Sequence, residues 1–275
     1  MLYRFTRTRL KAEWLLLVCA AGVILLYTWL GGFNARGQQT GSYAMFAFVY
    51  DDYSPGSAAK ALEVDVPEGA DMRAVYEALR AKTRGERYAC ILRDAENASF
   101  PMLDILAALL VSTLFRKRRM GQFLSAGYSR GQIFFSAALV YFAFAVLLWV
   151  IGAHFLLARF GISFAPEERA FFRTTQTAWF CSVLFGASLA FLFAMLLCRP
   201  VPAFLAAFGV WILLRRISPP LSISPAVILG PEKAVSSWDP GMDTSSLTAG
   251  NWIAAAFFAA VLLAAWLRFR KLNVK

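Results

Sequence analysis

The strongest constraint in this sequence is a set of long apolar runs that carry almost no charge. The two clearest, Ile133–Ala158 and Thr174–Cys198, are longer than the roughly 20 residues that a helix needs to cross a bilayer. Over the whole chain 59% of the 275 residues are hydrophobic and 16% are charged, whereas a water-soluble domain carries about 25% charged residues. We therefore expect an all-α polytopic membrane protein with six transmembrane helices, at Trp14–Phe33, Phe100–Phe115, Ile133–Ala158, Thr174–Cys198, Pro202–Ile217 and Asn251–Leu267.

The distribution of Lys and Arg predicts which segments face the cytoplasm. If both chain ends are cytoplasmic, the inner segments together hold 14 basic residues and a single acidic residue, Glu13. Such an excess of cations on one side is what the positive-inside rule describes. The pattern predicts a multi-pass protein of the cell membrane, with cytoplasmic N- and C-termini, in contact with membrane lipids. It does not favour a nucleic-acid partner, because the cations follow the topology and do not line one soluble face.

Three regions are expected along the chain: residues 1–33, 34–99 and 100–275. The first is a basic N-terminus with the first transmembrane helix, and the third holds the other five helices with the cytoplasmic loop 116–132. Between them we expect a small extracytoplasmic α/β unit, with strands at Met45–Tyr50 and Arg87–Leu92. A helix from Asp71 to Gly85 would join the strands, with apolar residues at helical spacing: Met72, Val75, Tyr76 and Leu79. The unit either stabilises the helices as a lid or contacts cargo or a partner.

The sequence lacks the residues that several kinds of catalytic site and metal site require. There is no G-x-x-x-x-G-K-[ST] phosphate loop, and His154 is the single histidine, which excludes an H-E-x-x-H zinc site. We expect no catalytic residue, no metal site and no cofactor in this chain.

Asp104 is the one acidic residue within a predicted span. Because burying a carboxylate in a membrane is costly, such a residue is a functional candidate. Asp104 is predicted about one turn inside the outer end of its helix, where it could reach water. Two roles follow: a snorkelling or capping residue, or a contact for substrate or an ion.

The basic stretch Arg116–Gln132 contains more than a topological signal. Met120, Phe123 and Leu124 stand at i, i+3 and i+4, which predicts one apolar face of a short helix at the membrane surface. Gly127 is placed to end that helix in the left-handed conformation. Ser129 and Gln132 then form a capping box that begins the third span. The stretch therefore predicts a short cytoplasmic helix on a rigid elbow between two transmembrane helices.

These residues resemble the type-2 ABC transporter permeases, the six-helix membrane subunits of ABC exporters. The family has a Gly-x-Ser-Arg-x-x-Ile element before its third helix, and the matching residues lie in FLSAGYSRGQIFFSAAL: Gly127, Ser129, Arg130 and Ile133. The six-span layout with cytoplasmic ends also agrees. The chain departs from the family in lacking an acidic residue between Leu114 and Lys117, and a Lys near Ala137.

The resemblance implies a function for the basic stretch. In the family this segment is the coupling helix, which docks into a groove on a separate ATPase subunit. Carried over, the docking contacts would be Arg119, Met120, Phe123 and Leu124, and the elbow would be held by Gly127, Ser129 and Arg130. The resemblance further implies a second permease subunit, identical or a sister chain, with ATP and Mg²⁺ bound in the partner ATPases. The alternative is a non-transporting sensor or assembly partner that binds a ligand through its external region.

Overall fold

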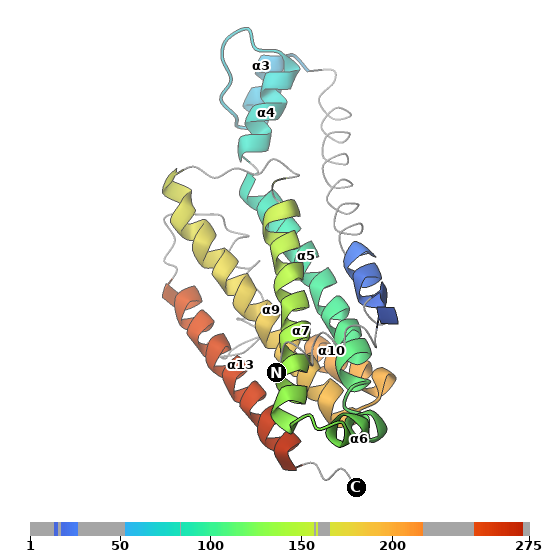
Figure 1. Ribbon diagram of the computed structural model, residues 1–275. Helices are drawn as coiled ribbons and strands as arrows, with labels where there is room; N and C mark the ends of the chain where they lie inside the picture. Colours follow the sequence, from blue (N-terminus) through green and yellow to red (C-terminus); the bar gives the residue numbers. More distant parts are fainter. Residues whose placement is uncertain are drawn as a thin grey trace.

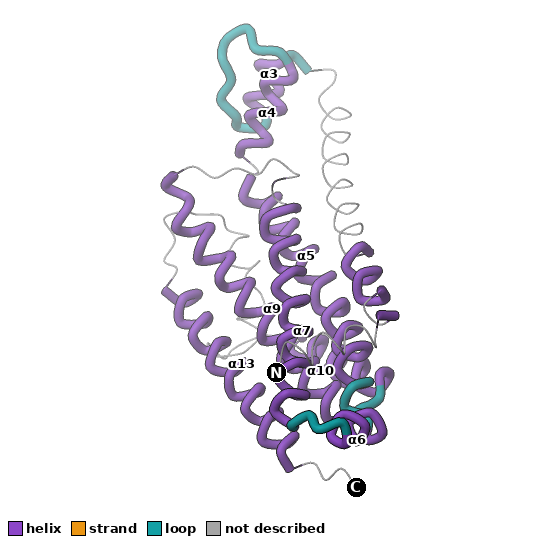
Figure 2. The backbone as a smooth tube through the Cα atoms, viewed as in Figure 1, coloured by secondary structure: helices purple, strands orange, loops and turns teal. Residues whose placement is uncertain are grey.

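The structure, a computed structural model, describes residues 14–15, 18–26, 53–82, 84–156, 158, 166–216 and 245–271. Within these ranges every regular element is a helix, as Figure 2 shows. The helices are α3 (Pro55–Ala61), α4 (Met72–Lys82), α5 (Arg84–Leu106), α6 (Lys117–Ser125), α7 (Arg130–Val150), α9 (Arg169–Leu197), α10 (Pro200–Arg216) and α13 (Ser245–Lys271). Two π-helices, η1 (Ala107–Ser112) and η2 (Ile151–Leu156), continue α5 and α7, and a 3-10 turn, η3 (Pro166–Glu168), precedes α9.

The long helices form one bundle around α9. In Figure 1, α5, α7, α9 and α13 run along its length, α6 lies at one end and α3 and α4 lie at the other. α9 contacts α5, η1, α7, α10 and α13, and one continuous core of buried apolar side chains joins these elements. α9, which contains most of the predicted span Thr174–Cys198, is therefore the central helix of the described bundle.

Among the described residues three helices are long and apolar enough to cross a membrane: Arg130–His154, Arg169–Leu197 and Asn251–Lys271. Two shorter apolar helices, Ala98–Ser112 and Pro200–Leu213, overlap two of the other predicted spans, Phe100–Phe115 and Pro202–Ile217. Of the predicted first span, only residues 14–15 and 18–26 are described. These observations indicate a membrane protein with an all-helical bundle.

The strand predicted at Arg87–Leu92 is wrong, because α5 runs through it from Arg84 to Leu106. Tyr88, Ile91 and Ala95 are buried, and their spacing of three and four residues is that of one helix face. Gly85 belongs to the first turn of α5, so it does not end the preceding helix, and the boundary predicted at residue 99 falls inside α5. The other predicted strand, Met45–Tyr50, lies outside the described residues.

The predicted helix after Asp71 is confirmed as α4, with an Asp71 Oδ1 that accepts from the amide of Ala74 at 2.8 Å. With α3 it forms a two-helix unit, residues 53–82, whose small core is made by Ala58, Ala59 and Val75. The unit lies at the end of the bundle opposite α6 (Figure 1).

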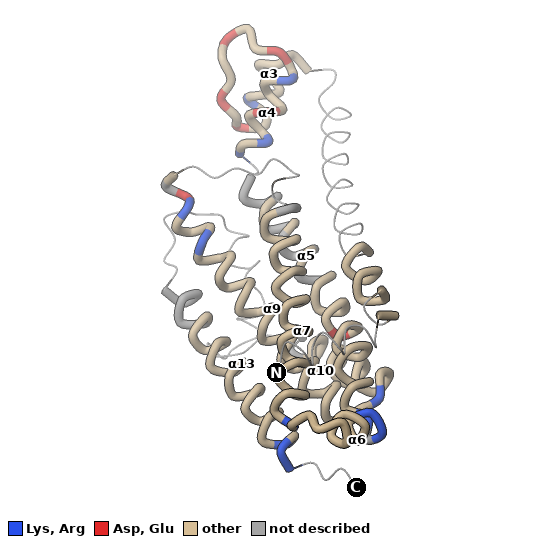
Figure 3. The backbone as a smooth tube through the Cα atoms, viewed as in Figure 1, with Lys and Arg blue, Asp and Glu red and all other residues tan. Residues whose placement is uncertain are grey.

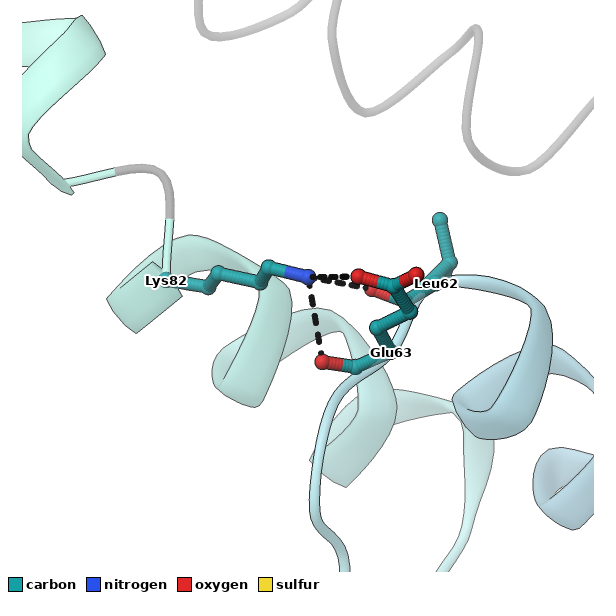
Figure 4. A network of polar contacts seen from close by, with 3 residues as sticks. All are labelled: Leu62, Glu63 and Lys82. Carbon is teal, nitrogen blue, oxygen red and sulfur yellow. Dashed lines mark hydrogen bonds and ion pairs between the residues drawn. The ribbon is translucent and has the colours of Figure 1, made fainter. Parts of the chain in front are cut away.

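Lys82 ties the two helices of this unit together, as Figure 4 shows. Its Nζ donates to the carbonyl oxygens of Leu62 and Glu63 at 3.0 and 3.1 Å and lies 3.3 Å from Glu63 Oε2. Glu63 follows the C-terminus of α3 in a left-handed conformation, with φ of 51°, which an L side chain adopts at a cost. Lys82 therefore stabilises a turn that would otherwise favour glycine.

Lys82→Met is expected to loosen this turn, because it removes all three contacts while the aliphatic stem stays. We expect a loss of about 1 kcal/mol of local stability, seen as faster amide hydrogen exchange in residues 58–64. Glu63→Gln is the control, since it removes only an exposed ion pair, which is worth about 0.5 kcal/mol. Equal exchange rates in wild type and Lys82→Met would contradict the assigned role.

Candidate functional site

The stretch Arg116–Gln132 folds as predicted, into a short helix with defined ends. α6 spans Lys117–Ser125. Gly127 follows with φ of 86°, and its amide donates to Leu124 O at 3.0 Å. The amide of Tyr128 donates to Phe123 O at 3.1 Å. These two bonds with a left-handed glycine are a Schellman motif, which satisfies the last carbonyls of α6 and fixes the direction in which the chain leaves it.

The next helix, α7, begins at Arg130, only three residues after Gly127. Ser129 is the N-cap of α7: its Oγ accepts from the amide of Gln132 at 3.2 Å, and its own amide donates to Gln132 Oε1 at 2.9 Å. This confirms the predicted capping box. Because both ends of the connection are hydrogen-bonded, the elbow between α6 and α7 has little freedom to bend.

The apolar face of α6 points into the chain's own bundle. Met120 is 2% exposed and lies in the main core, while Phe123 and Leu124 are half-buried against it. The ring of Phe123 also lies edge-on to Tyr128, with centroids 6.3 Å apart. The expectation that Met120 offers a docking contact does not fit this arrangement, because its side chain is covered by the core. A continuous apolar face that packs on a bundle is the ordinary reason for such spacing.

The opposite face of α6 is polar and open. Arg118, Gln122 and Ser125 are exposed, and Arg119 is half-buried at the edge between the two faces. Their spacing of three and four residues places the exposed side chains in one row along the helix. The surface of α6 that faces away from the bundle is therefore this row, which we call the outer face of α6.

Arg130 makes a contact that local sequence patterns did not indicate. Its Nη1 donates to the carbonyl oxygen of Arg270, in the last turn of α13, at 2.7 Å. The guanidinium thus satisfies a carbonyl that the helix itself leaves unpaired at its C-terminus. This hydrogen bond joins the start of α7, next to the elbow, to the end of α13.

A cluster of aromatic side chains fills the space behind the elbow. Phe134 of α7 packs edge-on against Phe191 of α9 at 5.6 Å and lies 5.7 Å from Phe269 of α13. Phe115, which ends the connection from η1, lies 5.0 Å from Phe269 and 6.3 Å from Phe191. Edge-to-face pairs of this kind contribute about 0.5–1.5 kcal/mol each. Met120 of α6 belongs to the same buried core as these rings. The elbow is therefore supported by close-packed side chains from α7, α9 and α13.

The α6 end of the bundle is strongly cationic, as Figure 3 shows. Among the described residues it holds Arg116, Lys117, Arg118, Arg119, Arg130, Arg268, Arg270 and Lys271. Apart from Asp104, the acidic residues of the described ranges belong to the α3–α4 unit and the turn before α9, at the other end (Figure 3), and to the first half of α5, at Glu86, Asp94 and Glu96. The cations of the α6 end and these acidic residues are therefore separated along the described part of the bundle.

Asp104 lies much deeper than predicted. α5 begins at Arg84, so Asp104 is 20 residues along it, and its side chain is 5% exposed. Its Oδ2 is buried and has no hydrogen-bond partner among the residues that the structure describes. The nearby Tyr141 hydroxyl donates to the carbonyl of Leu103 at 3.3 Å. A snorkelling or helix-capping role is therefore wrong for this conformation, and a contact with substrate or an ion stays a prediction.

The described residues contain no group of three or more His, Cys, Asp or Glu side chains that could hold a metal ion. Comparison of the chain with protein-family models, with characterised proteins and with solved structures finds no match. The fold and the site together define a helical membrane-type bundle with a clamped amphipathic helix at its basic end. Any assignment of function therefore rests on the geometry of that end.

Proposed function

We propose that this chain is the permease subunit of an ATP-driven ABC exporter and that α6 is its coupling helix. The observation that carries the proposal is the clamped, amphipathic α6: one face packs on the bundle, the other is exposed, and hydrogen-bonded caps join it to α7. A loop that only marked topology would need neither the Schellman motif nor the capping box. The resemblance of Gly127, Ser129, Arg130 and Ile133 to the family element supports the same reading.

In this proposal six spans cross the cell membrane, with both chain ends and α6 in the cytoplasm. Two permease subunits, identical or sister chains, meet around a translocation path, and two ATPase subunits bind below the outer faces of α6. ATP and Mg²⁺ are held by the ATPases, which carry out the hydrolysis, and this chain contributes no catalytic residue.

The geometry suggests how movement would pass from the ATPases to the spans. A displacement of α6 moves the start of α7 through the elbow and the end of α13 through the Arg130–Arg270 hydrogen bond. Because the aromatic cluster is packed, these ends move together. Nucleotide must favour one arrangement over the other by a few kcal/mol to shift the population substantially.

Charge reversal on the outer face of α6 tests the proposal. The tagged chain is co-expressed with candidate ATPase subunits, and the ATPase recovered per permease is measured after purification. Arg118→Glu with Gln122→Glu is expected to reduce recovery roughly tenfold, because it places like charges or unpaired carboxylates in the interface. Both side chains are exposed, so the thermal midpoint of the permease should stay within about 2 °C of wild type.

Two further variants distinguish docking from folding. Arg73→Glu with Arg80→Glu changes two residues of α4 at the opposite end, and it is expected to leave ATPase recovery unchanged. Phe123→Asp is expected to lower both recovery and thermal stability, because its ring packs against Tyr128 and the core. A wild-type chain that is folded but recovers no ATPase would overturn the transporter and favour the sensor or assembly partner.

A further inference from the structure

The last turns of α13 carry an exposed stripe that changes from apolar to cationic. Leu263 and Leu267 are 57% and 47% exposed, Trp266 is half-buried, and Arg270 and Lys271 are exposed. The first four of these fall at i, i+4, i+3 and i+7, which is one face of a helix. Along this face Leu263 comes first, Trp266 and Leu267 follow, and the cations come last, which is the order of acyl chain, interface and headgroup at a bilayer surface.

α7 extends the apolar part of the stripe sideways. Phe135 is 53% exposed and its ring lies 5.4 Å from that of Trp266. Leu139, one turn further along α7, is 57% exposed. The exposed side chains of two helices far apart in sequence therefore form one surface, which we call the α7–α13 edge: Phe135, Leu139, Leu263, Trp266, Arg270 and Lys271.

The cationic end of the α7–α13 edge is held in place by contacts from the elbow. The guanidinium carbon of Arg270 lies 6.0 Å from the centroid of the Trp266 ring, and the Arg270 carbonyl accepts from Arg130 at 2.7 Å. The Trp266 ring also lies beside the first turn of α7, since a Cβ at Gly131 would be in ordinary van der Waals contact with Trp266 Cη2, at 3.7 Å. The last turn of α13 is therefore fixed while the Arg270 and Lys271 side chains stay exposed.

Charge complementarity identifies the kind of molecule that this surface fits. Among the described residues no acidic side chain lies at this end of the bundle, so an anion here meets cations only. The cations alone would attract any phosphate, but the adjoining leucines and Phe135 are suited to a hydrocarbon chain. Only an amphipathic anion uses both parts.

We propose that the α7–α13 edge binds an anionic phospholipid from the cytoplasmic leaflet. Its phosphate lies at Arg270 and Lys271, its glycerol region at Trp266, and an acyl chain runs along Leu263 and Leu139. The inference rests on the membrane placement of the bundle and not on transport or on the partner of α6. It adds a lipid-binding surface on the side of the bundle, separate from the outer face of α6.

Competition between two lipids tests this site. The full chain in mild detergent is mixed with equal amounts of phosphatidylglycerol and phosphatidylcholine that carry the same acyl chains. Native mass spectrometry then counts each lipid that stays bound. Wild type is expected to retain phosphatidylglycerol preferentially, and the preference should fall about fivefold for each cation removed in Lys271→Gln and in Arg270→Gln with Lys271→Gln.

Arg73→Gln with Arg80→Gln is the matched control, because it removes the same charge from α4 at the other end. It is expected to leave the lipid preference unchanged. An equal loss in the control would mean that net charge alone attracts the lipid, and an unchanged preference in the α13 variants would place the lipid elsewhere; either result overturns the proposal. Inorganic phosphate at millimolar concentration should not displace the phospholipid, and complete displacement would show a phosphate site that needs no acyl chain.

Discussion

Gly186→Ala is expected to lower the free energy of unfolding by about 1–3 kcal/mol, the usual cost of overpacking a core. A Cβ at Gly186 would overlap the ring of Phe100, where α9 approaches α5. The ring has little room to move, because Phe100 is 2% exposed, stacks on Trp211 with centroids 5.6 Å apart and packs beside Phe185. Unfolding of the purified chain in mixed micelles, followed by tryptophan fluorescence, measures the change.

A second substitution tests whether the overlap is the cause. Phe100→Leu in the Gly186→Ala background shortens the side chain that the new methyl group meets, so it should restore part of the lost stability. Gly209→Ala on α10 is the control, since nothing lies within 4 Å of a Cβ there, and it should be neutral or slightly stabilising. If Gly186→Ala behaved like the control, the close approach of α5 and α9 would not be needed.

Phe191→Ala is expected to be the more damaging change, at about 3 kcal/mol. Phe191 is fully buried, and its ring lies within 5.6–6.3 Å of four other rings: Phe115, Phe134, Tyr141 and Phe142. We expect the lower part of the usual range for this substitution, because lipid is as apolar as the bundle core and the loss is mainly one of packing contacts. The same unfolding measurement gives the value.

Two other substitutions serve as controls for Phe191→Ala: a conservative change at the same position and a truncation at an exposed position. Phe191→Leu keeps most of the volume and should cost about 1 kcal/mol. Leu205→Ala, at a position of α10 that is 60% exposed, should change stability by no more than about 0.5 kcal/mol. A Phe191→Ala variant as stable as Leu205→Ala would show that the aromatic cluster does not support the elbow.

Local patterns predicted the part of the candidate site that is built from local interactions. The capping box needs only Ser129 and Gln132, three residues apart, and Gly127 needs only a helix end before it, so both could be predicted and both are confirmed. Which face of α6 stays exposed could not be predicted in this way. Apolar spacing indicates that a face is buried, but it does not say whether the chain's own core or another protein covers that face. The side chain of Met120 is covered by the chain's own core.

The wrong strand and the wrong depth of Asp104 have one physical cause: contacts between residues far apart in the sequence decide the structure there, and a local pattern does not contain them. Arg87–Leu92 has the composition of a short strand, yet tertiary contacts of Tyr88 with Thr175 and Gln176 on α9 stabilise it as helix. The same extension of α5 places Asp104 deep in the bundle. The Arg130–Arg270 hydrogen bond joins residues 140 positions apart, and no short-range pattern contains such a contact.

The π-helix η1 lies between Asp104 and the turn that leads into α6. A π-helix has more residues per turn than an α-helix. If η1 changed to α-helical geometry with the same number of turns, it would hold fewer residues, and the residues left over would join the turn before α6. Each residue passed on corresponds to about 1.5 Å of axial length and about 100° of rotation in an α-helix. A local change of helix type within Ala107–Ser112 would therefore turn the Asp104 side chain toward a different neighbour and shift α6 without unfolding either helix.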